Sequence, residues 1–151
     1  MRAALALPAP ARDVLEPNDG ISFVNGSVFA RPDPYVWRGS GRRALRGSAD
    51  RVEDPVDVYR VRLPRRSQAR IRLRPSFGNP DLYVFRGSAT SLDDRRHIIA
   101  RSRKGARRTD AVTIRNPGRT ARRFYIAIDV GASGGGLNAS YDLRFQRTKF
   151  R

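Results

Sequence analysis

The fold of this chain is decided by the stretch Val58-Tyr59-Arg60-Val61-Arg62-Leu63, whose pattern is repeated in Gln68-Ala69-Arg70-Ile71-Arg72-Leu73-Arg74. In both stretches apolar residues recur at every second position, and arginines stand between them. A period of two is typical of a β-strand that has one face on a core and the other in water. The two stretches therefore predict strands of a sheet with one dry and one solvated face.

Further stretches with strand composition follow at short intervals: Asp81–Arg86, Ile98–Arg101, Ala111–Arg115, Arg123–Val130 and Ser140–Gln146. Turn residues such as Gly78-Asn79-Pro80 and Asn116-Pro117-Gly118 separate them. This spacing predicts an all-β domain, an antiparallel β-sandwich of about seven or eight strands. Ile21–Phe29 is interpreted as a further candidate strand, and the triplet Arg46-Gly47-Ser48 as a turn.

The charge of the chain is strongly positive. Its 151 residues suffice for one domain, and 31 basic against 14 acidic side chains give a formal net charge of +17. Lys104 and Lys149 are the only lysines, so two explanations stay open: a polyanionic partner, or a genome whose base composition favours arginine. The candidate binding surface consists of the outward-facing arginines of the first two stretches: Arg60, Arg62, Arg70, Arg72 and Arg74.

Several kinds of chemistry are excluded by residue types that the sequence lacks. The chain has no cysteine, its only histidine is His97, and no serine lies in a G-x-S-x-G motif, so a nucleophilic triad is not expected and no catalytic residue is assigned. No apolar run approaches the roughly 20 residues of a membrane-spanning helix, so no membrane insertion is expected. The basic run 101–108 lacks stacking aromatics and is interpreted as a solvated hairpin, so nucleic acid is not an expected partner.

Acidic residues are scarce, and they gather in two loops, Glu16-Pro17-Asn18-Asp19 and Glu53-Asp54-Pro55-Val56-Asp57. Carboxylate and amide oxygens on loops are the ligands that calcium prefers. The alternative is ordinary turn chemistry, in which Asn-Asp and Asp-Pro form turns and nearby arginines pair with the carboxylates. Both interpretations stay open on the residues alone.

Taken in order along the chain, several motifs resemble those of one known family. The motifs are Glu16-Pro17-Asn18-Asp19, Leu45-Arg46-Gly47-Ser48, Asp54-Pro55-Val56-Asp57-Val58-Tyr59-Arg60-Val61, Asn79-Pro80-Asp81-Leu82-Tyr83-Val84-Phe85, Ile99-Ala100-Arg101-Ser102, Arg123-Phe124-Tyr125-Ile126-Ala127-Ile128 and Ser140-Tyr141-Asp142-Leu143. Each motif is short, but their order and spacing resemble the bacterial pre-peptidase C-terminal domain. This domain is found C-terminal to secreted proteases such as the subtilisin-like serine proteases.

The resemblance implies a jelly-roll-like β-sandwich over residues 16–147, a tail at 148–151, and a short N-terminal linker, 1–15, that is the remnant of a preceding domain. It implies secretion, with a signal expected upstream of this chain, and a protease catalytic domain N-terminal to it as partner. It also implies calcium as the bound ion, because the positions that match calcium ligands of related collagen-binding domains are occupied by Glu16, Asn18, Asp19, Asp54 and Asp57.

Two functions follow as hypotheses. The first is a non-catalytic accessory domain of a secreted, subtilisin-like protease, which aids stability or export, or attaches the enzyme to an extracellular polymer or a protein substrate. The second is a free-standing β domain that binds polyanions or nucleic acid through its arginine-rich face. Steep loss of affinity with salt is the mark of the second.

Overall fold

The structure is a computed structural model, and it describes residues 19–25, 42–52, 54–131 and 136–149. Two short helical turns, α1 (Ile21–Val24) and the 3-10 turn η1 (Arg95–His97), accompany the strands. The eight strands of the described chain are β1 (Arg42–Asp50), β2 (Val56–Leu63), β3 (Ser67–Phe77), β4 (Pro80–Arg86), β5 (Ile98–Ser102), β6 (Asp110–Asn116), β7 (Arg122–Val130) and β8 (Asn138–Lys149).

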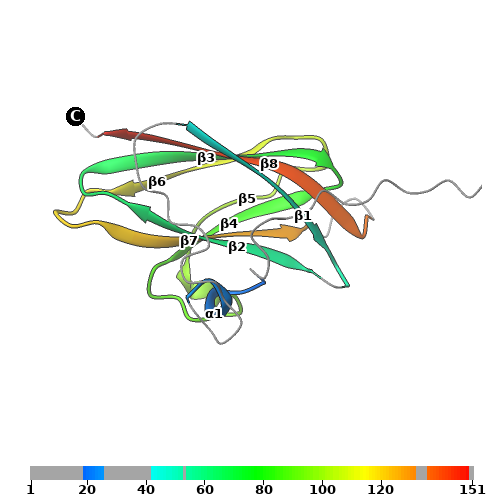
Figure 1. Ribbon diagram of the computed structural model, residues 1–151, viewed down its shortest axis with the longest axis horizontal. Coiled ribbons are helices and arrows are strands. Elements are labelled where there is room, and N and C mark those ends of the chain that lie inside the picture. Colours follow the sequence, from blue (N-terminus) through cyan, green and yellow to red (C-terminus); the bar gives the residue numbers. More distant parts are fainter. Residues whose placement is uncertain (1–18, 26–41, 53, 132–135, 150–151) are drawn as a thin grey trace, which may run out of the picture.

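The strands form two four-stranded sheets that pack face to face (Figure 1). Sheet A has the order β1-β8-β3-β6 and sheet B the order β2-β7-β4-β5, and all neighbouring strands are antiparallel. Consecutive strands alternate between the sheets, except where β4 and β5 are hydrogen-bonded neighbours. This is the jelly-roll order, so the predicted antiparallel jelly-roll-like sandwich is confirmed.

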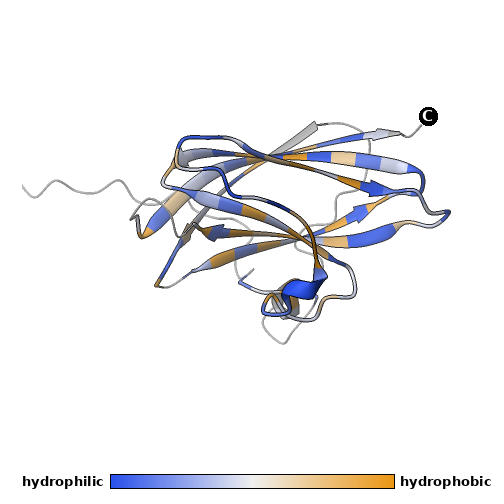
Figure 2. Cartoon of the chain, turned by 180° about the vertical axis from the view of Figure 1, so that it is seen from behind, coloured by the Kyte–Doolittle hydropathy of each residue, from blue (hydrophilic) through white to orange (hydrophobic). Residues whose placement is uncertain are grey.

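The main core lies between the two sheets. Its side chains come from alternate positions of most strands, and bands of opposite hydropathy are visible along several strands in Figure 2. Ile71 and Leu73 of β3 are fully buried, whereas Arg70 and Arg72, which alternate with them, are exposed. The period of two in the sequence therefore corresponds to an inner and an outer face of sheet A.

A second, smaller core covers the outer face of sheet B. The turn α1 lies against this face, together with residues of the connection between β4 and β5 (Figure 1). The buried members of this cluster are Ile21, Val24, Val58, Tyr83, Phe85, Ala89, Tyr125 and Ala127. Strand β4 is consequently buried on both faces, which explains its continuous apolar run.

All seven stretches expected to be strands are strands in the structure, and two other interpretations were wrong. The triplet Arg46-Gly47-Ser48 lies inside β1, where Gly47 is buried opposite Tyr141 of β8. Ile21–Val24 forms a turn of helix, not a strand, because Ile21 and Val24, three residues apart, both enter the second core. The rest of the candidate strand Ile21–Phe29 beyond Asn25, and the linker 1–15, lie outside the described residues.

Neither helical turn in the described part of the chain has the length or apolar character to cross a bilayer. Strand β8 continues to Lys149, past residue 147 where the domain was expected to end.

Candidate functional site

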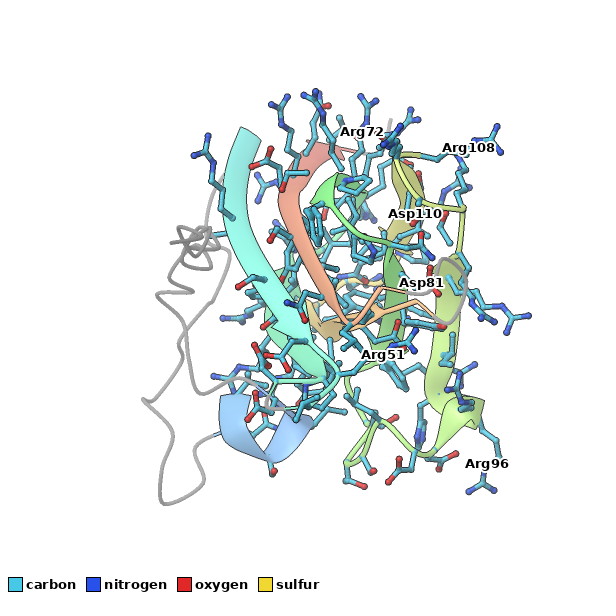
Figure 3. The ribbon with its side chains drawn as sticks, turned by 90° about the vertical axis from the view of Figure 1, so that its right-hand side faces the viewer. Arg51, Arg72, Asp81, Arg96, Arg108 and Asp110 are labelled. Carbon is cyan, nitrogen blue, oxygen red and sulfur yellow. The ribbon has the colours of Figure 1, made fainter. Side chains whose placement is uncertain are left out.

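The outer face of sheet A carries an array of exposed arginines on all four of its strands. Its described members are Arg46 of β1, Arg144 of β8, Arg70, Arg72 and Arg74 of β3, and Arg115 of β6. No described helix or connection packs over them as α1 packs over sheet B, and Figure 3 shows Arg72 pointing away from the sandwich at its upper edge. We call this set the arginine face.

In the middle of the arginine face, the residues directly opposite the arginines on neighbouring strands are not acidic. Arg72 lies directly opposite Arg144 on one side and opposite Ala111 on the other. Like charges in directly opposite positions disfavour strand pairing. At one margin Asp142 forms a salt bridge with Arg46, 3.3 Å between Oδ1 and Nε. The centre of the face thus presents several guanidinium groups whose cross-strand neighbours are not acidic.

The five arginines predicted as one binding surface are divided between the two sheets. Arg70, Arg72 and Arg74 belong to the arginine face, whereas Arg60 and Arg62 lie on β2 of sheet B. Arg60 points to the α1 side, where its Nη1 donates to Asn25 Oδ1 at 3.1 Å. Arg46, Arg115 and Arg144 complete the face instead, since β8 and β6 flank β3 and β1 lies on the other side of β8.

Among the predicted calcium ligands, Asp57 is fully buried between the two sheets. The Tyr141 hydroxyl donates to its Oδ2, and the Tyr59 hydroxyl lies 2.7 Å from that of Tyr141. Burial, with the neighbouring Tyr59 and Asp57, raises the pKa of Tyr141 well above its usual range, so this hydroxyl keeps its proton. Asp57 therefore belongs to a hydrogen-bonded group inside the core.

The other predicted ligands are only partly described. Asp54 follows the β1–β2 turn, where its backbone oxygen accepts from Asp50 N at 2.7 Å, and Asp19 precedes α1. Glu16 and Asn18 lie outside the described residues. Within the described ranges, no group of three or more acidic or histidine side chains is placed to hold a metal ion. Calcium binding stays a prediction, which the thermal unfolding midpoint in calcium and in chelator tests.

A pair of carboxylates that sequence reasoning missed lies at one end of sheet B. Asp81 of β4 and Asp129 of β7 are directly opposite each other in the register. Asp81 is only 2% exposed, and its Oδ2 accepts from Arg103 Nε at 3.2 Å. The Oδ1 atoms of Asp81 and Asp129 are both buried, without a hydrogen-bond partner among the described residues.

The electrostatics of the pair favour the protonated form of Asp129. Burial and the neighbouring Asp81 raise the pKa of Asp129 to about 6, against the opposing effect of Arg103, Arg95 and Arg51. Burial also raises the pKa of Asp81, although the hydrogen bond from Arg103 opposes the shift. Two carboxyl groups so close to one another do not both ionise easily.

The surroundings of the pair connect several loops. Gly131 N donates to Asn79 O and Arg51 Nη2 donates to Gly131 O, both at 2.6 Å. A Cβ at Gly131 would lie 2.5 Å from Nδ2 of the Asn79 side chain and 2.7 Å from the Asn79 backbone oxygen, so only glycine fits at this position. An aspartate inside each of two apolar strands was the available signal, but the register that brings them together is not readable from the sequence.

The basic run 101–108 passes from β5 into an exposed connection, so it is solvated as expected. The predicted hairpin was wrong, because β5 and β6, which this connection joins, belong to different sheets. Asp110, at the start of β6, accepts at its Oδ1 from Lys104 N at 2.8 Å and from the Ser102 hydroxyl at 2.5 Å. His97 lies in η1 just before β5, with Nδ1 3.4 Å from Asp94 Oδ2. Figure 3 shows Arg108 directed outward from this connection.

Comparisons with known proteins give similarity at the level of structure. No family model matches the chain, and no curated protein matches it. The structure is similar to the pre-peptidase C-terminal domain of a collagenase from Bacillus anthracis, with 12% identity, a TM-score of 0.48, and coverage of 78% of this chain and 98% of the other.

Two periplasmic inhibitors of g-type lysozyme are also similar. The protein from Aeromonas hydrophila has 14% identity and a TM-score of 0.49, with coverage of 75% of this chain and 94% of the other. The protein from Salmonella Typhimurium has 14% identity and a TM-score of 0.43, with coverage of 75% and 96%. The family named from the sequence motifs is thus among the structural neighbours, and at these values the comparisons carry no argument about function.

Proposed function

We propose that this chain is a non-catalytic attachment domain that binds an anionic extracellular polymer through the arginine face of sheet A. The single observation that carries the proposal is the uncovered array of six exposed arginines on β1, β8, β3 and β6. The outer face of sheet B is covered by a second core, so the equivalent surface there is not available as a flat platform.

The geometry of the array suits an extended polymer. Alternate residues of one strand are about 6.6 Å apart, and neighbouring strands are about 4.8 Å apart. Arg70, Arg72 and Arg74 thus form a row along β3, and Arg144 lies beside the middle of this row. Arginine stays charged at any physiological pH and binds carboxylate, sulfate or phosphate oxygens in a bidentate manner.

The repulsion between Arg72 and Arg144 favours a bound anion over an empty face. In the free domain only water and salt ions screen the repulsion between these two directly opposite guanidinium groups. An anionic polymer that lies across both strands removes this repulsion and releases its own counterions. The same charges that disfavour strand pairing in the free domain therefore favour binding.

As the larger context of this domain, we propose a secreted protease whose catalytic domain precedes it in the chain. The motifs that resemble the pre-peptidase C-terminal domain support this partner, among them Asn79-Pro80-Asp81-Leu82-Tyr83-Val84-Phe85, which forms the end of the β3–β4 connection and most of β4. Attachment to a polymer outside the cell would hold the enzyme near its substrate. A search of the DNA upstream of Met1 for an in-frame catalytic domain tests this part.

The test of attachment uses two variants that lose the same charge. The face variant carries Arg70→Ser, Arg72→Ser and Arg144→Ser, and the control variant carries Arg86→Ser, Arg101→Ser and Arg108→Ser at exposed positions elsewhere. Retention on immobilised heparin, lipoteichoic acid, peptidoglycan and collagen is measured against a salt gradient. We expect the face variant to elute at clearly lower salt than the control variant from at least one anionic polymer.

Equal loss in the two variants would show that net charge alone retains the protein, and would contradict a specific face. Tight and sequence-selective binding to nucleic acid at physiological salt would instead favour the free-standing nucleic-acid binder.

A further inference from the structure

Large apolar side chains are exposed at one end of the sandwich. Of the four such residues in the described chain, three lie in the connections or strand ends at this end: Val52 (79% exposed), Phe77 (65%) and Leu137 (61%). The fourth, Ile99, lies in β5. Single exposed apolar residues are normal on protein surfaces, but three that gather in one place indicate an interaction site.

Backbone contacts show that the three residues are close together. Arg51 N, next to Val52, donates to Leu137 O at 2.9 Å. Phe77 pairs with Ser140, near the start of β8, and the adjacent Gly78 packs against the backbone of Asn138. The β1–β2, β3–β4 and β7–β8 connections therefore meet at one end, on the right of Figure 1 and facing the viewer in Figure 3. We call Val52, Phe77 and Leu137 the apolar tip.

Exposed basic residues lie beside the apolar tip. Arg51 is in the same turn as Val52, and Arg103 joins this end through its bond to Asp81. The adjoining Lys104 is exposed as well. Among the described aspartates of this end, Asp81 and Asp110 are 2% and 1% exposed, and Asp50, Asp54 and Asp129 are half-buried. Among these described residues, the exposed charges around the apolar tip are thus the cations Arg51, Arg103 and Lys104, whereas the carboxylates are half-buried or buried.

The opposite end of the sandwich has a different character. The described residues of the β2–β3 and β6–β7 turns are Pro64, Arg65, Arg66, Pro117, Gly118, Arg119, Thr120 and Ala121, with no large apolar side chain among them. The apolar tip is therefore a property of one end and not of turns in general. Packing in the core does not explain why these three positions carry apolar residues, because each side chain exposes most of its surface.

We propose that the apolar tip adsorbs to the surface of an anionic lipid bilayer, with its three side chains in the headgroup region and Arg51, Arg103 and Lys104 against the lipid phosphates. The interface of a bilayer accepts single projecting side chains from separate loops, whereas a protein partner requires a fitted surface. Cations near an anionic leaflet add to the attraction. Adsorption of this kind involves no segment that crosses the membrane.

The experiment uses the full chain and vesicles of phosphatidylglycerol and phosphatidylcholine. The chain has no cysteine, so Phe77→Cys provides a single site for an environment-sensitive nitrobenzoxadiazole label. Thr113→Cys, exposed on the outer face of sheet A, provides the matched control. We expect the emission of the label at position 77 to shift to the blue with vesicles, and the label at position 113 to remain unchanged. A shift at position 113 alone would overturn the proposal, because the arginine face would then be the adsorbing surface.

A co-sedimentation measurement with unlabelled protein completes the test. We expect the triple variant Val52→Ser, Phe77→Ser and Leu137→Ser to bind the vesicles at least roughly tenfold more weakly than the unmodified chain, since burial of each apolar side chain is favourable. The control Ile99→Ser should bind as the unmodified chain does. Retention of the triple variant on heparin should not change, which separates this proposal from the one for the arginine face. Equal vesicle binding by the triple variant, or no binding by the unmodified chain, would overturn the proposal.

Discussion

The outer faces of the two sheets are both formed by alternate residues of their strands, yet one face is covered and the other is exposed. On sheet B the outward positions include Tyr83, Phe85 and Tyr125, and these are covered by α1 and the β4–β5 connection. On sheet A the outward positions include Arg70, Arg72 and Arg144, and these are exposed. The difference shows that, among the described residues, apolar side chains are buried on the outer face of sheet B but not at these arginine positions of sheet A.

The residues of the uncovered face can therefore serve binding without a role in packing. Replacement of its arginines removes no core contact, because the inner positions of the same strands, such as Ile71 and Leu143, already fill the main core. The predictions below test this separation between a face that stabilises the fold and a face that binds.

The largest expected effect is on the covered face. Phe85→Ala removes a side chain that is 3% exposed in the second core, and we expect a loss of about 3 to 5 kcal/mol in the free energy of unfolding. The matched control Phe77→Ala changes a side chain that is mostly exposed, and should cost within about 0.5 kcal/mol. Urea denaturation measures both. Similar values for the two variants would show that the second core does not contribute to stability.

The next effect concerns binding to the polymer. For nucleic acids, each phosphate neutralised contributes about 0.7 to 0.9 to the slope of log affinity against log salt concentration. If heparin behaves similarly, the loss of three contacts in the face variant lowers this slope by about two to three units. Titrations with heparin at several salt concentrations measure the slope. An unchanged slope would place the contacts elsewhere on the protein.

A smaller effect is expected at the carboxylate pair. The pKa of Asp129 is raised to about 6 in the folded protein, from the 3.8 of an ordinary aspartate, so the folded state binds the proton more tightly. The resulting stabilisation is complete below about pH 4 and is lost as the pH rises through 6. We expect Asp129→Asn to gain on the order of 1 kcal/mol at pH 7, after allowance for partial exposure, and to flatten the dependence of stability on pH.

Thermal or urea unfolding between pH 4 and pH 8 measures this dependence. The control Asp142→Asn removes a carboxylate from the arginine face, where Asp142 pairs with Arg46, and should keep the pH dependence of the unmodified chain. A pH dependence of stability that is the same in Asp129→Asn as in the unmodified chain would contradict the raised pKa of Asp129.

The smallest effect is at the centre of the arginine face. Arg72→Ala relieves the repulsion between Arg72 and Arg144, and we expect a gain of a few tenths of a kcal/mol in stability at low salt. Since salt screens exposed charges, the gain should disappear in about 1 M salt. A loss of stability at low salt would show that the arginine contributes to the fold.

Local patterns in the sequence predicted most of the fold, because alternation is a property of a few adjacent residues. Val56–Leu63 and Ser67–Phe77 contain the predicted strands almost unchanged. Strand β1 was missed, since Arg46-Gly47-Ser48 has the composition of a turn and becomes part of a strand only through its pairing with β8. The helical turn Ile21–Val24 likewise depends on packing against sheet B.

The candidate site was less readable for the same reason. Alternation correctly predicted that Arg70, Arg72 and Arg74 point outward, but not that Arg60 and Arg62 belong to the other sheet. The register that places Arg144 beside Arg72 and Asp129 beside Asp81 depends on pairing between strands far apart in the sequence. Residue types in the sequence indicate which side chains could bind a ligand, whereas the topology of the sheets decides which of these side chains lie together.

The most direct test of the central claim is the map of amide chemical shifts when heparin oligosaccharide is added to the isotope-labelled chain. The arginine face predicts that the largest changes fall on β1, β8, β3 and β6, at the residues near Arg70, Arg72 and Arg144. Changes centred on β2 and β7, or on the connection 103–109, would contradict it, because the polymer would then bind where the arginine face is absent.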